Sequence, residues 1–229
     1  MKRVVKLEGK GNIAIEDVET PAITNREILV KNKANLISRG SEIYRRYLSP
    51  HAVDPSIMGY SAAGVVAAVG NEVTGFSVGD RVAVIAPHAE YVAVNPPEKD
   101  CVLLPHDVSF EEGTFNVLTT CAVAWAQSAN IQPGNSVIIL GQGLVGSLML
   151  QVVREYEPGQ VIAVDALDLR CRMAQDLGAD TVINCSQEDP VEAVRHLTKG
   201  EGADVVIDCV GGKAGIKSFE QAQDMVKRY

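Results

Sequence analysis

The amino-acid sequence predicts an α/β protein, and three observations support that prediction. Its 229 residues fit one large domain or two small ones. Residues 1–117 hold short runs of Val, Ile and Ala separated by Gly and Pro, which predicts a compact, mainly antiparallel β domain, barrel-like or sandwich-like. Residues 118–229 open with a helix and then alternate apolar runs with helical stretches, which predicts β-α-β units on a parallel sheet.

The predicted β domain rests on five short runs of apolar residues. We expect strands at residues 12–18, 27–36, 62–69, 81–85 and 89–94. Turn signals rich in Gly, Pro, Asn and Asp lie between strands, at residues 8–11, 78–80 and 95–97. A short helix is expected to start near Gly40 and to carry Tyr44 and Tyr47.

A helix is expected to lead from the β domain into the second domain. Ser109 can cap its N-terminus while Glu112 reaches back to the cap, an arrangement called a capping box. The apolar run continues to about Asn130, and Pro133-Gly134 then ends the helix. We therefore expect one helix over residues 109–130.

From Ser136 onward, each expected strand is followed by an expected helix. The strands are placed at residues 137–140, 161–164, 181–184 and 204–210. The helices are placed at residues 144–156, 168–177, 190 onward and 213–229. Asp189 and Pro190 suit the start of the third helix, because Asp caps free amides and Pro lacks an N–H that would have no partner there.

Residues 137–146 read VIILGQGLVG, with Gly141, Gly143 and Gly146 at the spacing G-x-G-x-x-G. The loop follows an expected strand and opens an expected helix, the setting in which this spacing binds a dinucleotide. Gly141 permits the turn, Gly143 lets a pyrophosphate approach the backbone, and Gly146 lets helix and strand pack closely. The helix beginning at Leu144 would offer amides and a partial positive charge to the phosphates. A glycine-rich turn in an unrelated α/β domain is the alternative.

An acid, Asp165, ends the next expected strand. Its carboxylate can accept hydrogen bonds from a ribose diol and would repel a 2′-phosphate, which favours NAD over NADP. Arg170 lies five residues further on, where it could meet an adenosine phosphate or be a solvated arginine on a helix face. We therefore expect NAD as the cofactor, with NADP as the alternative.

Composition and charge exclude several classes of protein. The net charge is −8, from 21 Lys and Arg against 29 Asp and Glu, which argues against a nucleic-acid binder with a basic face. No apolar run approaches the ~20 residues that a membrane span needs, and no signal peptide is expected. The five cysteines are scattered, which is typical of reduced thiols in a cytoplasmic protein. A small-molecule substrate is the expected partner.

Six segments together resemble the medium-chain dehydrogenase/reductase superfamily, the relatives of zinc-type alcohol dehydrogenase and quinone reductase. They are IMGYSAAGVVAAVG (57–70), VTGFSVGDRVAV (73–84), HAEYVAV (88–94), NIQPGNSVIILGQGLVG (130–146), LGADTVINCSQED (177–189) and GADVVIDCVGG (202–212). The resemblance implies a GroES-like β-barrel-type catalytic domain over residues 1–117. It implies a Rossmann dinucleotide-binding domain, a doubly wound parallel sheet, over residues 118–229. The chemistry it implies is hydride transfer to or from a nicotinamide.

The resemblance also implies roles for individual residues. Asp165 corresponds to the acid that binds the ribose. Val145 corresponds to the residue that buttresses the nicotinamide ring, and Thr120 stands where a threonine commonly contacts that ring. Arg39, in LISRGSEIY (36–44), stands where some members place an arginine on the pyrophosphate, and two phosphates in a cleft need neutralising.

Zinc-dependent members hold the catalytic metal with a cysteine, a His-Glu pair and a third ligand. The matching places in this chain hold Ser38, Tyr60, Ser61 and Asn116. The four-cysteine loop that binds a structural zinc is missing from the sequence too, because residues 82–87 run directly into His88. Zinc takes Cys, His and carboxylate ligands, so we expect no metal.

Without zinc, a hydrogen-bond donor must stabilise the oxyanion that forms as a carbonyl accepts hydride. Tyr60 is the first candidate and Ser38 the second, and Glu42 could orient either. The alternative for Tyr60 is a packed aromatic ring whose hydroxyl binds a main-chain carbonyl. The alternative for Ser38 is a loop or cap hydroxyl.

The segments SRGSE and GYSAAG resemble a zinc-less branch of the superfamily that acts on alcohols or ketones of sugars, cyclitols and pigment precursors. The expected function is therefore a zinc-independent oxidoreductase that transfers a hydride between NAD(H) and a secondary alcohol or ketone. Two alternatives remain open: an NADPH-dependent quinone or enone reductase, and a non-catalytic nucleotide-binding remnant.

In the family, fifth and sixth strands follow the helix with which this sequence stops. The resemblance therefore implies a parallel sheet that lacks its last strands, in a chain that is either a fragment or a truncated member. The sixth strand often pairs across a dimer, so a homodimer is implied for a full-length form.

Overall fold

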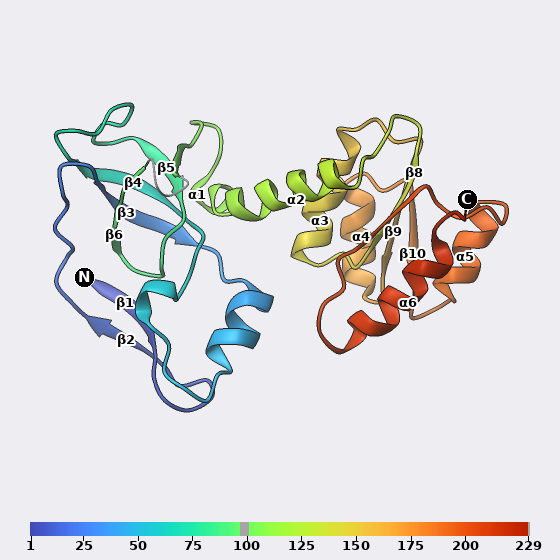
Figure 1. Ribbon diagram of the computed structural model, residues 1–229, viewed down its shortest axis with the longest axis horizontal. Helices are drawn as coiled ribbons and strands as arrows, with labels where there is room; N and C mark the ends of the chain where they lie inside the picture. Colours follow the sequence, from blue (N-terminus) through green and yellow to red (C-terminus); the bar gives the residue numbers. More distant parts are fainter. Residues whose placement is uncertain (97–100, 229) are drawn as a thin grey trace. The chain divides into compact units, whose positions relative to one another are not determined.

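A computed structural model describes residues 1–96 and 101–228 of the chain. The chain divides into two compact units, Met1–Val117 and Leu118–Tyr229, and each is described by itself (Figure 1). The first unit is built on antiparallel strands and the second on a parallel sheet flanked by helices. The predicted α/β class, with an antiparallel domain followed by a parallel one, is confirmed. No described helix combines the length and the apolar character needed to cross a membrane.

The first unit contains a five-stranded antiparallel sheet in the order β6-β3-β4-β5-β7. Its strands are β3 (Ile28–Asn35), β4 (Ala62–Val69), β5 (Arg81–Val84), β6 (Tyr91–Val94) and β7 (Cys101–Leu103). Alternate residues of β3 and β6 are buried, as in a sheet with one face on a core. Strand β7 was not predicted from the sequence. The turn predicted over residues 95–97 reaches Pro97, which lies outside the described residues.

A hairpin of β1 (Lys2–Lys6) and β2 (Ile13–Asp17) forms a separate two-stranded sheet. Strand β1 was not predicted, because two of its five residues are lysines. One of them, Lys6, is only 1 % exposed. Its ammonium donates to the carbonyls of Leu7, of Gly9 at 2.8 Å and of His51 at 3.2 Å. Three backbone acceptors therefore compensate the buried charge and join the hairpin to the loop that contains His51.

Helix η1 (Arg39–Tyr47) is a π-helix, in which the amide of Ile43 donates to Ser38 and that of Leu48 donates to Ile43. A one-turn 3-10 helix, η2 (Pro55–Ile57), follows it. The helix predicted over residues 109–130 is two helices, α1 (Phe110–Gly113) and α2 (Asn116–Ser128). The predicted capping box of Ser109 and Glu112 is confirmed at the start of α1.

The second unit contains four parallel strands in the order β10-β9-β8-β11 within its described residues. They are β8 (Ser136–Leu140), β9 (Gln160–Asp165), β10 (Thr181–Asn184) and β11 (Val205–Asp208). The helices are α3 (Leu144–Arg154), α4 (Asp168–Asp176), α5 (Pro190–Leu197), the short η3 (Gly212–Ala214) and α6 (Gly215–Met225). The last predicted helix, over residues 213–229, ends earlier than expected, and Tyr229 lies outside the described residues.

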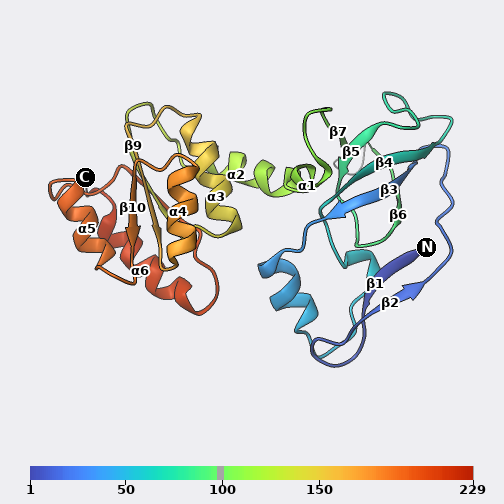
Figure 2. The same ribbon diagram turned by 180° about the vertical axis from the view of Figure 1, so that it is seen from behind.

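Helices cover both faces of this sheet, as in a doubly wound fold. Val137 and Ile139 of β8 pack with residues of α2, α3 and α4, whereas Ile138 and Leu140 pack with residues of α5 and α6. Figures 1 and 2 show α3 on one side of the strands and α5 and α6 on the other. The carboxyl ends of β8 and β9 thus emerge together at the edge where the glycine-rich loop begins.

Candidate functional site

The glycine-rich loop connects β8 to α3, as predicted. Gly141 has a positive φ of 82°, and its amide donates to the carbonyl of Val164 at 2.7 Å. Gly143 is the N-cap of α3, and no side chain among the described residues caps the helix there. The first amides of a helix have no partner within it, so those after Gly143 are available to a ligand. Leu144 is exposed and Val145 partly exposed at this end of α3.

Two glycines of the loop differ in the space that a side chain would find there. A Cβ on Gly146 would lie 1.7 Å from the carbonyl oxygen of Gly141, so the close packing of helix against strand requires glycine. A Cβ on Gly143 would meet only the guanidinium of Arg170, at 3.9 Å, so open space lies over this residue. A pyrophosphate fits that space, which has amides on one side and a cation beside it.

Asp165 lies at the end of β9 and is 7 % exposed. One carboxylate oxygen accepts the amide of Gln142 at 2.7 Å and the other accepts that of Leu167 at 2.9 Å. The bond to Gln142 fixes the acid to the glycine-rich loop itself. Each carboxylate oxygen keeps a further lone pair for a hydroxyl, so the residues present fit a ribose diol next to the pyrophosphate space.

Arg170, on α4, places its Nη1 atom 3.5 Å from Oδ2 of Asp165, the oxygen that also accepts the amide of Gln142. Its side chain is 35 % exposed. The guanidinium lies next to both Asp165 and the space over Gly143, and its contact with a cofactor phosphate stays a prediction. The second unit therefore brings together seven of the predicted cofactor residues: Gly141, Gly143, Leu144, Val145, Gly146, Asp165 and Arg170.

The other two predicted cofactor residues lie elsewhere in the chain. Thr120 is an exposed residue of α2, in the second unit. Arg39 is the first residue of η1, in the first unit, and it is exposed. Its guanidinium donates to the hydroxyl of Tyr44 at 3.0 Å and lies 5.6 Å from the centre of that ring. Their contacts with a cofactor stay predictions.

The two predicted catalytic residues differ in how they are held. Ser38 caps η1, and its hydroxyl accepts the amide of Ser41 at 3.3 Å, which is the cap role named above as the alternative. Tyr60 is partly buried and follows Gly59, whose φ is 110°. Among residues 1–96 and 101–228, no hydrogen bond from the Tyr60 hydroxyl to a main-chain carbonyl is present. The catalytic role of Tyr60 stays a prediction.

Glu42 and His88 form a buried pair that the sequence did not reveal. Oε1 of Glu42 lies 2.7 Å from Nε2 of His88, and the two side chains are 0 % and 7 % exposed. The other oxygen of Glu42 accepts the amide of Ser38 at 2.7 Å. Glu42 thus binds the backbone amide of Ser38 and not the Ser38 hydroxyl. A separation of 46 residues leaves no spacing signal for such a pair.

Metal ligands are not gathered at the positions that zinc would need. Among the described residues, no group of three or more His, Cys, Asp or Glu side chains could hold a metal ion. Ser61, which follows Tyr60, is buried and its hydroxyl donates to the carbonyl of Thr114. Zinc independence stays a prediction, which a chelation experiment below addresses.

Two partly buried thiols and one buried phenol have raised pKa values and are poor candidates for chemistry. Burial raises the pKa of the Cys101 thiol to about 11 and that of the Cys209 thiol to about 12. Both thiols are therefore protonated at neutral pH and are not nucleophiles. Burial, followed by the nearby charge of Glu42, raises the pKa of Tyr47, which keeps that phenol neutral beside the Glu42 pair.

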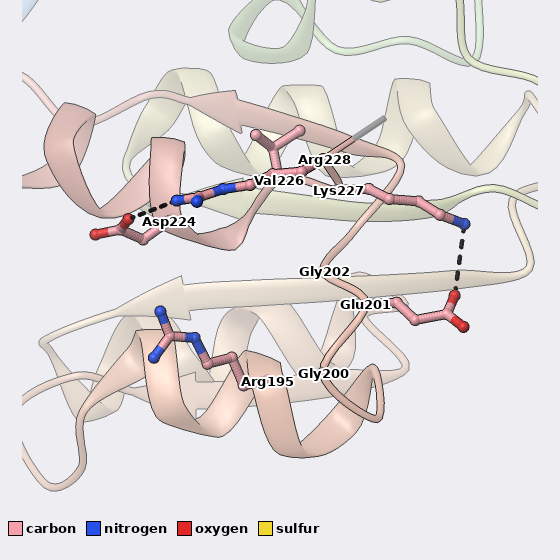
Figure 3. A pocket seen from close by; sticks show the side chains of 8 residues that line it. All are labelled: Arg195, Gly200, Glu201, Gly202, Asp224, Val226, Lys227 and Arg228. Carbon is pink, nitrogen blue, oxygen red and sulfur yellow. Dashed lines mark ion pairs between the residues drawn. The ribbon is translucent and has the colours of Figure 1, made fainter.

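A cavity of about 440 Å³ lies away from the glycine-rich loop, between α5 and the end of α6 (Figure 3). Its cations already have acidic partners: Lys227 lies 3.5 Å from Glu201, and Arg228 lies 3.6 Å from Asp224. Arg195 pairs with Glu192 at 2.7 Å. Because these charges are neutralised within the protein, the cavity is a poor binding site for an anionic cofactor.

Two known families match the chain, one after the other along its length. The family described as "Alcohol dehydrogenase GroES-like domain" matches residues 24–122. The family described as "Zinc-binding dehydrogenase" matches residues 145–228.

Known proteins match over nearly the whole chain. Sorbitol dehydrogenase of Bacillus subtilis is 29% identical over 90% of this chain and 67% of its own length. L-threonine 3-dehydrogenase of Symbiobacterium thermophilum is 31% identical over 95% of this chain and 70% of its own. The solved Escherichia coli quinone oxidoreductase complexed with NADPH is 25% identical, with a TM-score of 0.84 over 100% of this chain and 71% of its own. An Escherichia coli oxidoreductase/dehydrogenase of unknown specificity has a TM-score of 0.87 at 26% identity, over 100% and 75%.

Proposed function

The chain belongs to the medium-chain dehydrogenase/reductase superfamily and is an oxidoreductase of small-molecule substrates that uses a nicotinamide cofactor; from this premise we propose that it transfers a hydride between NAD(H) and a secondary alcohol or ketone, without zinc. Residues 118–229 bind the cofactor and residues 1–117 supply the groups that act on the substrate. The observation that carries the proposal is Asp165, which is bound to the glycine-rich loop and retains lone pairs for a ribose diol.

The predicted cofactor residues have separable tasks in this proposal. The amides that follow Gly143 and the guanidinium of Arg170 bind the pyrophosphate, and Asp165 binds the adenosine ribose. Val145 and Thr120 support the nicotinamide ring, which supplies or accepts the hydride when the cofactor is bound. Arg39 adds a second positive charge to the pyrophosphate.

In the first unit, Tyr60 is the proposed proton donor and acceptor. During reduction its hydroxyl donates a hydrogen bond, and then the proton, to the carbonyl oxygen that becomes negatively charged. During oxidation the same oxygen takes the proton back. Ser38 contributes a second polar group, although its hydroxyl already caps η1.

Relatives support a polyhydroxylated substrate. Proteins similar to this chain include sorbitol dehydrogenases and probable D-xylulose reductases, at 28% to 30% identity. We therefore propose a polyol, sugar or cyclitol with a secondary hydroxyl as the substrate class. The test is a panel of polyols with NAD and of the matching ketoses with NADH, followed by absorbance of the reduced cofactor. Turnover of a polyol supports the proposal, and turnover of quinones or enones alone contradicts it.

A second candidate function is NADPH-dependent reduction of a quinone or enone. A quinone oxidoreductase of Pseudomonas syringae is 31% identical to this chain, with a TM-score of 0.81 over 99% of this chain and 70% of its own. The partly exposed guanidinium of Arg170 could also bind a 2′-phosphate. Titration of Trp125 fluorescence with NADH and NADPH separates the two, because Trp125 is on α2 in the second unit. Binding without any turnover would favour the non-catalytic alternative.

Replacing Tyr60 by Phe tests the proton donor. We expect kcat to fall about 10²-fold, since general acid-base catalysis contributes that much or more. NADH affinity should not change, because the glycine-rich loop is untouched. Tyr91→Phe, which removes another partly buried phenol of the same unit, is the matched control. Unchanged turnover in Tyr60→Phe would make Tyr60 a packing residue.

Prolonged dialysis against a chelator tests zinc independence. We expect kcat to be unchanged after dialysis and after addition of Zn²⁺, because the positions of the zinc ligands hold Ser38, Tyr60, Ser61 and Asn116. Elemental analysis of the dialysed protein is the accompanying measurement. Loss of activity that Zn²⁺ restores would show that this prediction is wrong.

A further inference from the structure

Glu42 and His88 form a buried hydrogen-bonded pair in the first unit, at 2.7 Å. Neither residue has a role in the hydride transfer proposed above. A buried carboxylate is costly unless hydrogen-bond donors surround it. Glu42 has two such donors, one on each oxygen: the ring of His88 and the amide of Ser38.

The pair connects the two segments that carry the proposed catalytic residues. On one side, Glu42 holds the amide of Ser38 at 2.7 Å, at the N-terminus of η1. On the other side, the amide of His88 donates to the carbonyl of Met58 at 2.6 Å, two residues before Tyr60.

Gly59 brings the Tyr60 segment into direct contact with His88. A Cβ on Gly59 would lie 2.7 Å from the backbone nitrogen of His88 and 2.8 Å from its Nδ1, so only glycine allows this approach. The φ of Gly59, at 110°, also excludes most side chains. The close contact between Gly59 and His88 therefore fixes the direction of the backbone immediately before Tyr60.

Two more features confirm that the pair is a fixed element rather than a surface contact. The carbonyl of His88 accepts the amide of Val4 at 2.9 Å, which ties the residue to β1. Tyr47, at the end of η1, is buried close enough to Glu42 for the carboxylate to contribute to its raised pKa.

We propose that Glu42 and His88 are positioning residues, which hold the Ser38 and Tyr60 segments in fixed relation to each other. This inference rests on the proposed function, because it assigns the pair to the placement of Tyr60 and Ser38. Misplacement of reacting groups by about 1 Å can lower a rate about 10²-fold, so a buried pair that never touches substrate can control kcat.

Four variants test the proposal. Glu42→Ala and His88→Leu remove the connection, and we expect kcat to fall about 10²-fold while the substrate KM changes less than about threefold. Glu42→Gln and His88→Gln keep a hydrogen bond at the same place, and we expect them to restore kcat to within about tenfold of wild type. Hydrogen exchange at the Ser38 amide should become fast in Glu42→Ala and stay slow in Glu42→Gln.

Lys6→Met is the matched control, since it removes another buried polar group of the same unit whose hydrogen bonds lie outside the Ser38 and Tyr60 segments. Equal kcat losses in this control and in His88→Leu, or unchanged kcat in folded Glu42→Ala, would overturn the positioning role. If Glu42→Ala or His88→Leu does not fold, hydrogen exchange at the Ser38 amide in folded Glu42→Gln still tests the proposal. Fast exchange at that amide contradicts the positioning role. A wild-type protein that turns over no alcohol, ketone, quinone or enone instead refutes the proposed function.

Discussion

Replacing Gly146 by alanine is expected to destabilise the second unit by about 3 kcal/mol and to lower its Tm by roughly 10 °C. The added Cβ would lie 1.7 Å from the carbonyl oxygen of Gly141, where no side-chain rotation can relieve the overlap. Helix α3 would have to move away from β8, and with it the amides proposed to bind the pyrophosphate. Thermal unfolding followed by circular dichroism measures the loss, and NADH titration measures the effect on binding.

Gly143→Ala is the control, because the same methyl group enters open space. Its Cβ would meet only Arg170, at 3.9 Å, and the φ of −74° suits alanine. We expect an unchanged Tm and an NADH affinity about 10- to 100-fold weaker, since the methyl occupies the place of the pyrophosphate. If Gly143→Ala bound NADH as well as wild type, the pyrophosphate would not lie over this residue.

Replacing Asp165 by serine is expected to weaken NADH binding about 10²-fold and to shift the ratio of Kd values toward NADPH. A hydrogen bond to a charged group contributes about 1.5–3 kcal/mol, and the charge that repels a 2′-phosphate is removed. Arg170, no longer paired at 3.5 Å, is then free to bind that phosphate. The ratio of Kd values is the measurement, because it does not depend on the stability of the variant.

Asp204→Ser is the matched control for a general loss of stability. Asp204 also holds a backbone amide, that of Ser136 at 2.8 Å, but at the opposite end of β8 from the loop. Asp204→Ser should lower the Tm without changing the ratio of the Kd values for NADH and NADPH. The double variant Asp165→Ser with Arg170→Gln should lose the gain in NADPH binding. An unchanged ratio in Asp165→Ser alone would remove the basis for assigning NAD.

Much of the fold was predictable because its signals are local. Apolar runs followed by helical periods identified β8 to β11, and the Asp189-Pro190 start of α5 follows from capping chemistry alone. Strands β1 and β7 were missed, because β1 contains two lysines and β7 has only three residues. The break between α1 and α2, near Thr114, depends on the buried hydroxyl of Ser61 and other tertiary contacts, which no sequence window contains.

One part of the candidate site was predictable from the sequence, and another part was not. The glycine-rich loop and Asp165 lie on consecutive strands, so their meeting follows from the parallel sheet. The position of Arg170 could not be decided from its helix face alone, because it depends on how α4 packs against the loop. The Glu42 pair could not be predicted at all, since a π-helix and a distant loop bring its two residues together.

The buried ammonium of Lys6 makes this residue a natural probe of the hairpin. Amine-acylating reagents need a neutral and accessible nitrogen, whereas this one is 1 % exposed and donates to three carbonyls. Lys10, in the same hairpin, is exposed and should react at once. Mass spectrometry of the two modified peptides would therefore time the opening of the first unit in the intact chain, with no engineered label.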